Sequence, residues 1–153
     1  MNKPNYWLMK SEPDAYSIET LEKEKETIWD GIRNYQARNF MRNMEIGDQA
    51  FFYHSNCKPP GIVGLMEIVK TNIVDPTQFD QNSKYYDAKS EKQNPRWDCV
   101  KVKFLFKSKE IISLQELRKL FNEDELKVVK KGNRLSILPV EKKSADFLIN
   151  KLK

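Results

Sequence analysis

The sequence predicts an α+β fold, namely a small mixed β-barrel with flanking helices against its openings. Three observations predict it. Short apolar segments with strand character recur along the chain, helical segments fall between them at irregular intervals, and a length of 153 residues suits one domain. A doubly wound sheet would need a regular strand–helix alternation. We therefore expect residues 1–153 to form a single domain.

The first half of the chain combines short strands with two helices. Ser17 precedes a short helical stretch and is expected to cap it, since a serine hydroxyl can accept from a free backbone N–H. Residues 34–44 predict a second helix, because most of their apolar side chains recur at spacings of three and four. Short apolar runs bounded by turn residues predict strands over residues 6–10, 27–30, 49–54 and 62–70.

A polar connection follows over residues 72–96. Its aromatic residues Phe79, Tyr85 and Tyr86 are expected to order it in part. A connection of this length in a compact domain is often functional.

The last third of the chain starts with its clearest alternation, over residues 97–107. One face of this predicted strand carries the apolar side chains Val100, Val102, Phe104 and Phe106.

Ser113 and Glu116 then form a capping box that opens a helix. Leu117, Leu120 and Phe121 are expected to point inward from it. A turn at Gly132 leads to a strand over 135–138, and the tail from 141 to 152 predicts a closing helix.

Composition limits the class of protein. Hydrophobic residues make up 39% and charged residues 32%, a balance typical of globular domains, and the longest apolar runs are far shorter than a membrane span. We expect no membrane partner. The net charge of +5 favours a polyanion such as DNA or RNA.

The cysteines, the single histidine and the first residues bear on compartment and cofactors. Met1–Asn5 contains a lysine without a following apolar segment, so we expect no signal peptide. A chain of 153 residues does not need a disulfide between Cys57 and Cys99 to be stable, which favours a reduced, cytoplasmic protein. With His54 alone and no metal-ligand spacing, we expect no metal and no cofactor.

Local catalytic signatures are missing from the sequence. The five glycines give neither a phosphate-binding loop nor a dinucleotide fingerprint. Gly61–Gly64 has the spacing of the KH-domain clamp, but it lies at a strand start rather than between two helices. A Ser-His-Asp triad stays possible, because triads are not local in sequence, and it would have to use His54.

Aromatic and polar residues stand side by side where strands end. Such clusters occur at residues 6–12, 29–31, 53–56 and 94–97. A pocket for an unstacked base needs this mixture, since aromatic faces sandwich the base while hydroxyl, amide and carboxylate groups bind its edge. Stacking contributes about 1–3 kcal/mol per base, enough to help a base leave its neighbours.

Packing is the competing interpretation of the same residues. Phe51 and Phe52 lie within a strand and favour the core, whereas Trp29 and Trp97 lie at element edges and suit core or pocket equally. His54 alone is more typical of a hydrogen-bonded structural residue. Arg38 and Arg42 share a helix face, which is either simply solvated or able to follow phosphates.

Five motifs in order resemble the EVE domain family. Residues 6–13 (Tyr-Trp-Leu-Met-Lys-Ser-Glu-Pro) resemble its opening motif, and residues 29–39 (Trp-Asp-Gly-Ile-Arg-Asn-Tyr-Gln-Ala-Arg-Asn) its second, nearly without a break. The third to fifth are similar to residues 52–56 with 61–64, 94–97, and 133–136 with 139–140. The resemblance covers essentially the whole chain. It implies a PUA-like barrel that binds nucleic acid carrying a modified base, with modified cytosine in DNA favoured and modified RNA as the other choice.

The resemblance also implies site residues. The order of elements is similar to that of YTH domains, which by analogy makes Trp29 and Trp97 the two walls of a base cage. The base-binding pocket is expected to comprise Trp7, Lys10, Ser11, Trp29, Arg33, Asn34, Gln36, Tyr53, His54, Ser55 and Trp97. The residues expected to meet phosphates are Arg38, Arg42, Lys131 and Arg134.

Two other functions stay open. Related PUA-like folds include amidohydrolases that act on modified nucleosides, and Lys10, Ser11 and a carboxylate such as Glu12 or Glu67 could imitate their lysine–hydroxyl–carboxylate group. Against this, neighbouring residues on a strand point to opposite faces. The second alternative is a protein-binding module with an unused pocket.

Overall fold

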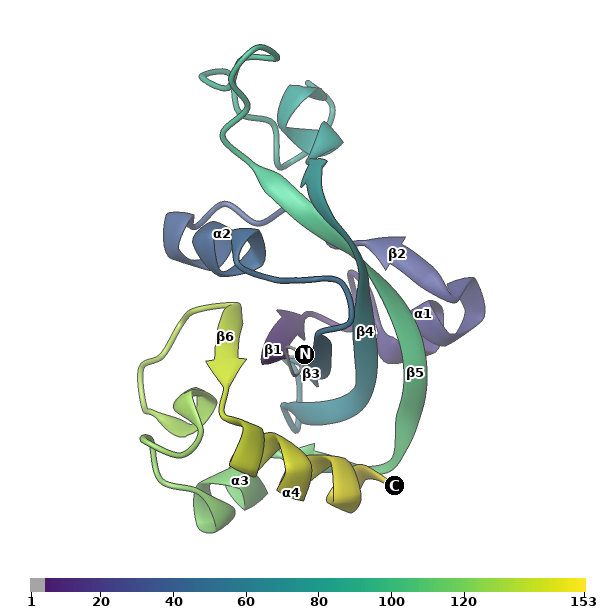
Figure 1. Ribbon diagram of the computed structural model, residues 1–153, viewed down its shortest axis with the longest axis vertical. Coiled ribbons are helices and arrows are strands. Elements are labelled where there is room, and N and C mark those ends of the chain that lie inside the picture. Colours follow the sequence, from purple (N-terminus) through teal and green to yellow (C-terminus); the bar gives the residue numbers. More distant parts are fainter. Residues whose placement is uncertain (1–4) are drawn as a thin grey trace.

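The computed structural model describes residues 5–153 as one six-stranded sheet with helices on both sides (Figure 1). The strands are β1 (Tyr6–Ser11), β2 (Glu26–Ile28), β3 (Gln49–His54), β4 (Gly61–Val74), β5 (Asp98–Ser113) and β6 (Ile137–Val140). The helices are α1 (Ile18–Glu24), α2 (Tyr35–Arg42), α3 (Leu114–Leu120) and α4 (Lys142–Leu152), with short 3-10 turns η1 (Pro76–Phe79) and η2 (Lys127–Val129). The predicted elements are therefore present, and the α+β class is confirmed.

The strands are ordered β2-β5-β4-β3-β1-β6. β1 and β3 run parallel, and every other neighbouring pair is antiparallel. β4 and β5 are long, and their pairing shifts register at several points, which bends them strongly (Figure 1). The edge strands β2 and β6 do not pair with each other within residues 5–153, so the sheet is not closed and the expected barrel is not confirmed.

Alternation along the central strands builds two cores. Trp7 and Met9 of β1 enter a cluster with α1 and α2, whereas Leu8 between them enters a cluster with α3 and α4. In β3, Phe52 and Phe51 divide in the same way. Because strand side chains alternate between faces, a strand covered on both sides reads as a continuous apolar run.

Serine and asparagine side chains start three of the helices. The Ser17 hydroxyl accepts from the Thr20 backbone N–H at 3.2 Å, as predicted for the start of α1. Ser113 caps α3 by accepting from Glu116 at 3.1 Å. One prediction for α3 is wrong: Leu117 is buried, but Leu120, in the last turn of this short helix, is exposed.

The connection predicted over residues 72–96 is shorter and better ordered than expected. β4 continues to Val74, and buried hydrogen-bonding groups hold the residues after it in place. The Gln78 amide donates to the backbone oxygens of Asp75 and Trp97, each at 2.7 Å, and its oxygen accepts from the Ser90 hydroxyl. The segment thus forms a folded extension beyond the ends of β4 and β5 (Figure 1).

None of the helices described for residues 5–153 is long and apolar enough to cross a membrane.

Candidate functional site

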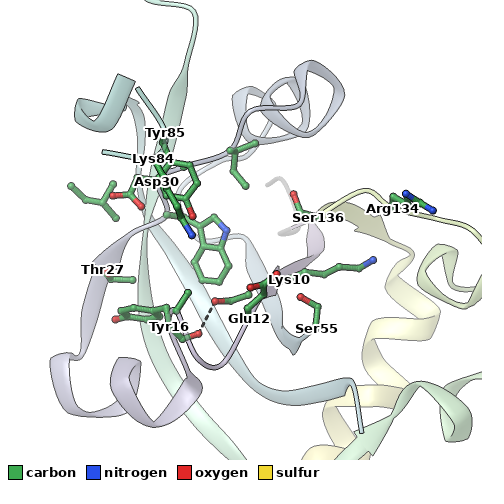
Figure 2. Close-up of a pocket in the computed structure, with 16 residues that line it drawn as sticks. Lys10, Glu12, Tyr16, Thr27, Asp30, Ser55, Lys84, Tyr85, Arg134 and Ser136 are labelled. Carbon is green, nitrogen blue, oxygen red and sulfur yellow. Dashed lines mark hydrogen bonds between the residues drawn. The ribbon is translucent and has the colours of Figure 1, made fainter. Parts of the chain in front are cut away.

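A cavity of about 730 Å³ opens where β1 and β3 end. Because these strands are parallel neighbours, their carboxyl ends meet at the same edge of the sheet, a common place for ligand sites. Segments from distant parts of the chain complete the cavity (Figure 2). The lining residues are Lys10, Ser11, Glu12, Ala15, Tyr16, Thr27, Ile28, Trp29, Asp30, Gly31, Ile32, Ser55, Lys84, Tyr85, Arg134 and Ser136. The volume falls within the range of small-molecule sites.

The end of β1 supplies the polar floor. The Ser11 hydroxyl donates to the Tyr16 backbone oxygen at 2.6 Å, which fixes its direction and leaves its lone pairs free to accept. Lys10 is half-buried, its ammonium lies 5.7 Å from the centre of the Tyr53 ring, and burial lowers its pKa. Lys10 and Ser11 both line the cavity because it lies beyond the strand end, so the expected separation onto opposite faces does not keep them apart.

Three aromatic residues, Tyr16, Trp29 and Tyr85, line the cavity, and the last two form walls of it. Trp29 is only 7% exposed and packs edge-on against Phe52, with ring centres 5.4 Å apart. Tyr85 lies against Gly31, where a Cβ atom would stand 2.7 Å from the Tyr85 ring. Gly31 adopts a φ of +81°, a conformation that glycine reaches without strain. The absence of a side chain at residue 31 therefore lets the tyrosine approach.

Arg33 holds the Tyr85 wall from behind. Its guanidinium donates to the Tyr85 backbone oxygen at 2.8 Å, to Thr77 Oγ1 at 2.9 Å and to the Asp75 carboxylate at 3.1 Å. Asp75 is buried, and it also accepts from the Gly31 backbone N–H at 2.8 Å. One carboxylate and one guanidinium thus tie both sides of the Tyr85–Gly31 contact together.

Charged groups surround the opening. Lys84 and Arg134 face the cavity from different segments, with Tyr16 and Thr27 on the side opposite Arg134 (Figure 2). Asp30 is exposed overall, yet partial desolvation of its carboxyl and the nearby Asp75 charge raise its pKa. The three lysine and arginine residues of the lining outnumber its two carboxylates. The excess of positive charge favours an anionic ligand. The two carboxylates can accept hydrogen bonds from donors on the part of the ligand that enters the cavity.

Four of the residues predicted for the base pocket line this cavity. They are Lys10, Ser11, Trp29 and Ser55. Arg134, predicted as a phosphate contact, joins them.

Trp97 lies elsewhere, so the two-tryptophan cage needs correction. Trp97 does not line the cavity. It is 5% exposed and stacks on Tyr35, with the two ring centres 4.8 Å apart. Its indole N–H donates to Asp87 at 2.8 Å. The Arg33 guanidinium lies near both the Trp97 ring and the Tyr85 ring, and Arg33 does not line the cavity either.

The side chains of three other predicted pocket residues are buried or hydrogen-bonded within the fold. The Trp7 indole donates to the buried Asp48 at 2.9 Å, and Tyr53 is buried in the second core. His54 Nε2 accepts from the Ile18 backbone N–H at 3.1 Å, so it helps to start α1.

Asn34 and Gln36 lie at the start of α2. The Asn34 side chain caps the helix by accepting from Ala37 at 2.9 Å, and Gln36 is exposed. Sequence alone made these residues plausible because they neighbour Trp29 along the chain, but the helix carries them away from the cavity lining.

The other predicted phosphate contacts lie on the surface outside the cavity. Arg38 donates to the Arg96 backbone oxygen at 2.8 Å, and Arg42 forms an ion pair with Asp98. Lys131 is exposed beside the turn at Gly132.

Sequence reasoning missed several lining residues. Tyr16, Thr27 and Lys84 carry no local signal, because they reach the cavity only through the fold, and Ser136 was part of the fifth motif without being assigned to the pocket. Tyr85 had a weak signal as an aromatic residue in a long connection, and Gly31 as a glycine directly after Trp29-Asp30.

Comparison with known proteins identifies relatives of the chain. The family model described as the EVE domain matches residues 5–151. Thymocyte nuclear protein 1 of Rattus norvegicus is 45% identical, over 97% of this chain and 74% of the relative.

Two crystal structures show similar folds. That of a Pseudomonas putida protein is 43% identical with a TM-score of 0.92, covering 97% of this chain and 99% of that chain. That of the human THYN1 protein, in complex with DNA containing 5-methylcytosine, is 44% identical with a TM-score of 0.88, covering 95% and 96%.

A more distant likeness concerns the fold alone. The YTH domain of Zygosaccharomyces rouxii MRB1, whose structure holds N6-methyladenosine RNA, has a TM-score of 0.57 at 12% identity, covering 100% of this chain and 89% of that one. The predicted similarity in element order to YTH domains is therefore confirmed at the level of the fold.

Proposed function

Because this chain belongs to the EVE domain family, we propose that it is a reader of modified bases in nucleic acid, and that its favoured ligand is 5-methylcytosine in DNA. The base leaves its stack and enters the cavity at the ends of β1 and β3, while the charged rim holds the backbone. The single observation that carries the proposal is this cavity: two aromatic walls, Trp29 and Tyr85, above a floor of hydrogen-bonding groups.

The chemistry of the lining suits a cytosine. The exocyclic amine of cytosine donates hydrogen bonds, and carboxylates are its usual acceptors in proteins. Glu12 and Asp30 supply such acceptors, and Lys10 supplies a donor for the carbonyl oxygen on C2. A 5-methyl group adds apolar surface that the Trp29 indole would cover. The human relative bound to 5-methylcytosine DNA supports the same ligand.

Paired oligonucleotides test the proposal. We would measure binding, by fluorescence anisotropy, of two DNA duplexes that differ only by one methyl group on cytosine. The wild-type protein is expected to prefer the methylated duplex, and Tyr85→Ala to lose about 1–3 kcal/mol of binding free energy together with the preference. Tyr86→Ala is the matched control, since Tyr86 is the exposed neighbour outside the cavity lining. Equal affinity of the wild type for both duplexes would refute the proposal.

The charged residues at the cavity opening are expected to affect binding in a different way from the aromatic walls. Lys84 and Arg134 are expected to contribute through phosphate contacts, because their charges flank the opening without forming its walls. Arg134→Gln should weaken methylated and unmethylated duplexes alike and flatten the dependence of affinity on salt concentration. A selective loss for the methylated duplex would instead assign Arg134 to the base itself.

A second candidate is hydrolysis of an acylated nucleoside. The observation in its favour is that Lys10, Ser11 and Glu12 line one cavity and that burial lowers the Lys10 pKa, as suits a lysine acting as a base. The test is release of acetate from N4-acetylcytidine, followed by chromatography, in the wild type and Lys10→Ala. Turnover lost in Lys10→Ala supports the enzyme; absence of turnover in the wild type removes it.

A further inference from the structure

The outer surface of α2 presents a second aromatic face beside the cavity. Tyr35 is 51% exposed, the most of any aromatic side chain in residues 5–153. Its ring stacks nearly parallel on Trp97, at 4.8 Å and 19°. Trp97 is itself immobilised, since its backbone N–H donates to Gln78 at 3.2 Å and its indole N–H to Asp87 at 2.8 Å. Tyr35 is therefore an exposed ring on a rigid backing.

The outer face of the Tyr35 ring is open. The Arg38 guanidinium carbon lies 4.7 Å from the Tyr35 ring centre and 5.8 Å from that of Trp97. A group on the far side of Tyr35 would be much farther from Trp97 than that, because the two rings are themselves 4.8 Å apart. The Arg38 guanidinium thus lies beside the stack and leaves the outer face of the Tyr35 ring uncovered.

This ring is linked to the cavity wall through Trp97 and Arg33. The Arg33 guanidinium carbon lies 5.8 Å from the Tyr85 ring centre and 5.2 Å from the Trp97 ring centre. With the 4.8 Å step from Trp97 to Tyr35, these separations keep the outer ring within about 16 Å of the cavity wall. That is about the length of five base steps of 3.4 Å, so one strand can reach both places.

Positive charge accompanies the open ring. Arg38 donates to the Arg96 backbone oxygen at 2.8 Å and to the exposed Asn39 Oδ1 at 2.9 and 3.2 Å, but within the part of the chain that is described it forms no ion pair, so its charge is not neutralised. Arg96 is 39% exposed and only loosely paired with Asp87, at 3.9 Å. An exposed aromatic face next to guanidinium groups is the combination that binds single-stranded nucleic acid: the ring stacks a base and the guanidinium meets its phosphate.

We infer that the open face of Tyr35 is a second stacking site, which takes an unpaired base of the same strand whose modified base enters the cavity, with Arg38 at the adjoining phosphate. The inference rests on the proposed function for the path of the strand, but it does not require the base in the cavity to be modified. It assigns the Trp97–Tyr35 pair a role outside the cavity: Trp97 positions the ring that a neighbouring base contacts.

The test compares ligands that reach one site or both. The probes are the nucleoside 5-methyl-2′-deoxycytidine, a single-stranded nonanucleotide with one central 5-methylcytosine, and the same strand with abasic sites at every other position. Tyr35→Ala is expected to weaken the intact strand about ten-fold and to leave the nucleoside and the abasic strand unchanged. Tyr35→Phe, which keeps the ring, should bind like the wild type. Melting temperature checks that each variant is folded.

The outcomes separate this inference from the proposed function. Equal affinity of the wild type and Tyr35→Ala for the intact strand overturns the inference, and so does an equal loss for the nucleoside, which would mean that Tyr35 acts on the cavity. If methylation makes no difference but Tyr35→Ala still weakens an unmodified strand, the stacking site stands and the modified-base proposal fails. A wild-type protein that binds no strand overturns both.

Discussion

The ring of Tyr85 lies against the backbone of Gly31 so closely that a Cβ atom at residue 31 would stand 2.7 Å from Tyr85 Cε2. This contact joins the extension between β4 and β5 to the segment that follows Trp29, and it makes one wall of the cavity. Arg33 and Asp75 bind both partners from behind. The shape of the cavity therefore depends on a glycine that contributes no side chain.

Gly31→Ala is expected to displace Tyr85 and to lower both stability and binding. The positive φ alone costs an alanine about 1 kcal/mol or more, and the contact with the ring adds to it. Gly132→Ala is the matched control: Gly132 has a φ of +80°, and a Cβ atom added there would meet nothing within 4 Å. Thermal unfolding and nucleic-acid binding of the two variants would be compared. Equal losses of stability and binding would show that the Tyr85 contact is unimportant.

Arg33→Gln is expected to lower the free energy of unfolding by about 2–4 kcal/mol, because it leaves the buried Asp75 carboxylate without its cation. Arg33→Lys should recover little, since an ammonium cannot replace the separate donations to Tyr85, Thr77 and Asp75. Urea denaturation measures the effect. Arg42→Gln, which breaks the more exposed pair with Asp98, should cost less than about 1 kcal/mol. A similar loss of unfolding free energy for Arg33→Gln and Arg42→Gln would argue against a special stabilising role of Arg33.

Gln78→Glu is expected to destabilise the protein by about 3 kcal/mol or more, although the two side chains have nearly the same shape. The Gln78 amide donates to two backbone oxygens at 2.7 Å, and a buried carboxylate there would face those oxygens without a proton to offer. Gln81→Glu, on the exposed surface, should change stability by no more than about 0.5 kcal/mol. Chemical denaturation at pH 8 tests this. If the two changes are equivalent, the buried amide does not organise the extension.

Stability is expected to fall as the pH is lowered through about 6.5, the ordinary pKa of histidine. Burial lowers the pKa of His54 in the folded protein, and its Nε2 must stay unprotonated to accept from the Ile18 N–H. The unfolded chain therefore takes up the proton first, which favours unfolding below that pH. His54 is the only histidine, so its NMR titration is free of overlap.

The His54→Gln variant provides the control for this pH dependence. Its stability between pH 7.5 and about 5.5 should vary less than that of the wild type, whatever its absolute value. A folded-state His54 pKa at or above 6.5 would contradict the proposed linkage.

The position of most elements was predictable because it depends on local rules. Short apolar runs mark β1 and β3, alternation marks the first part of β5, and the capping serines Ser17 and Ser113 mark where α1 and α3 begin. The strand ends were less predictable. β4 and β5 extend to Val74 and Ser113 through bent regions with register shifts, where partly exposed residues weaken the alternation.

Barrel closure could not be predicted from the same patterns. Closure depends on whether the edge strands β2 and β6 pair with each other. Whether they meet is decided by the curvature of the whole sheet, which the residues of these two strands alone do not determine. Leu120 was misplaced for a related reason, because a two-turn helix offers several apolar positions and its orientation against the sheet decides which are buried.

The sequence by itself determined the two-sided apolar strands, the helix caps and the family motifs, because these depend on the spacing and chemistry of neighbouring residues. It also placed Lys10, Ser11, Trp29 and Ser55 in a common site. The tertiary structure alone decided that Tyr85, rather than Trp97, joins Trp29 in the cavity lining. That outcome depends on how the segment between β4 and β5 folds back over Gly31, a contact 54 residues apart in the chain that no local pattern encodes.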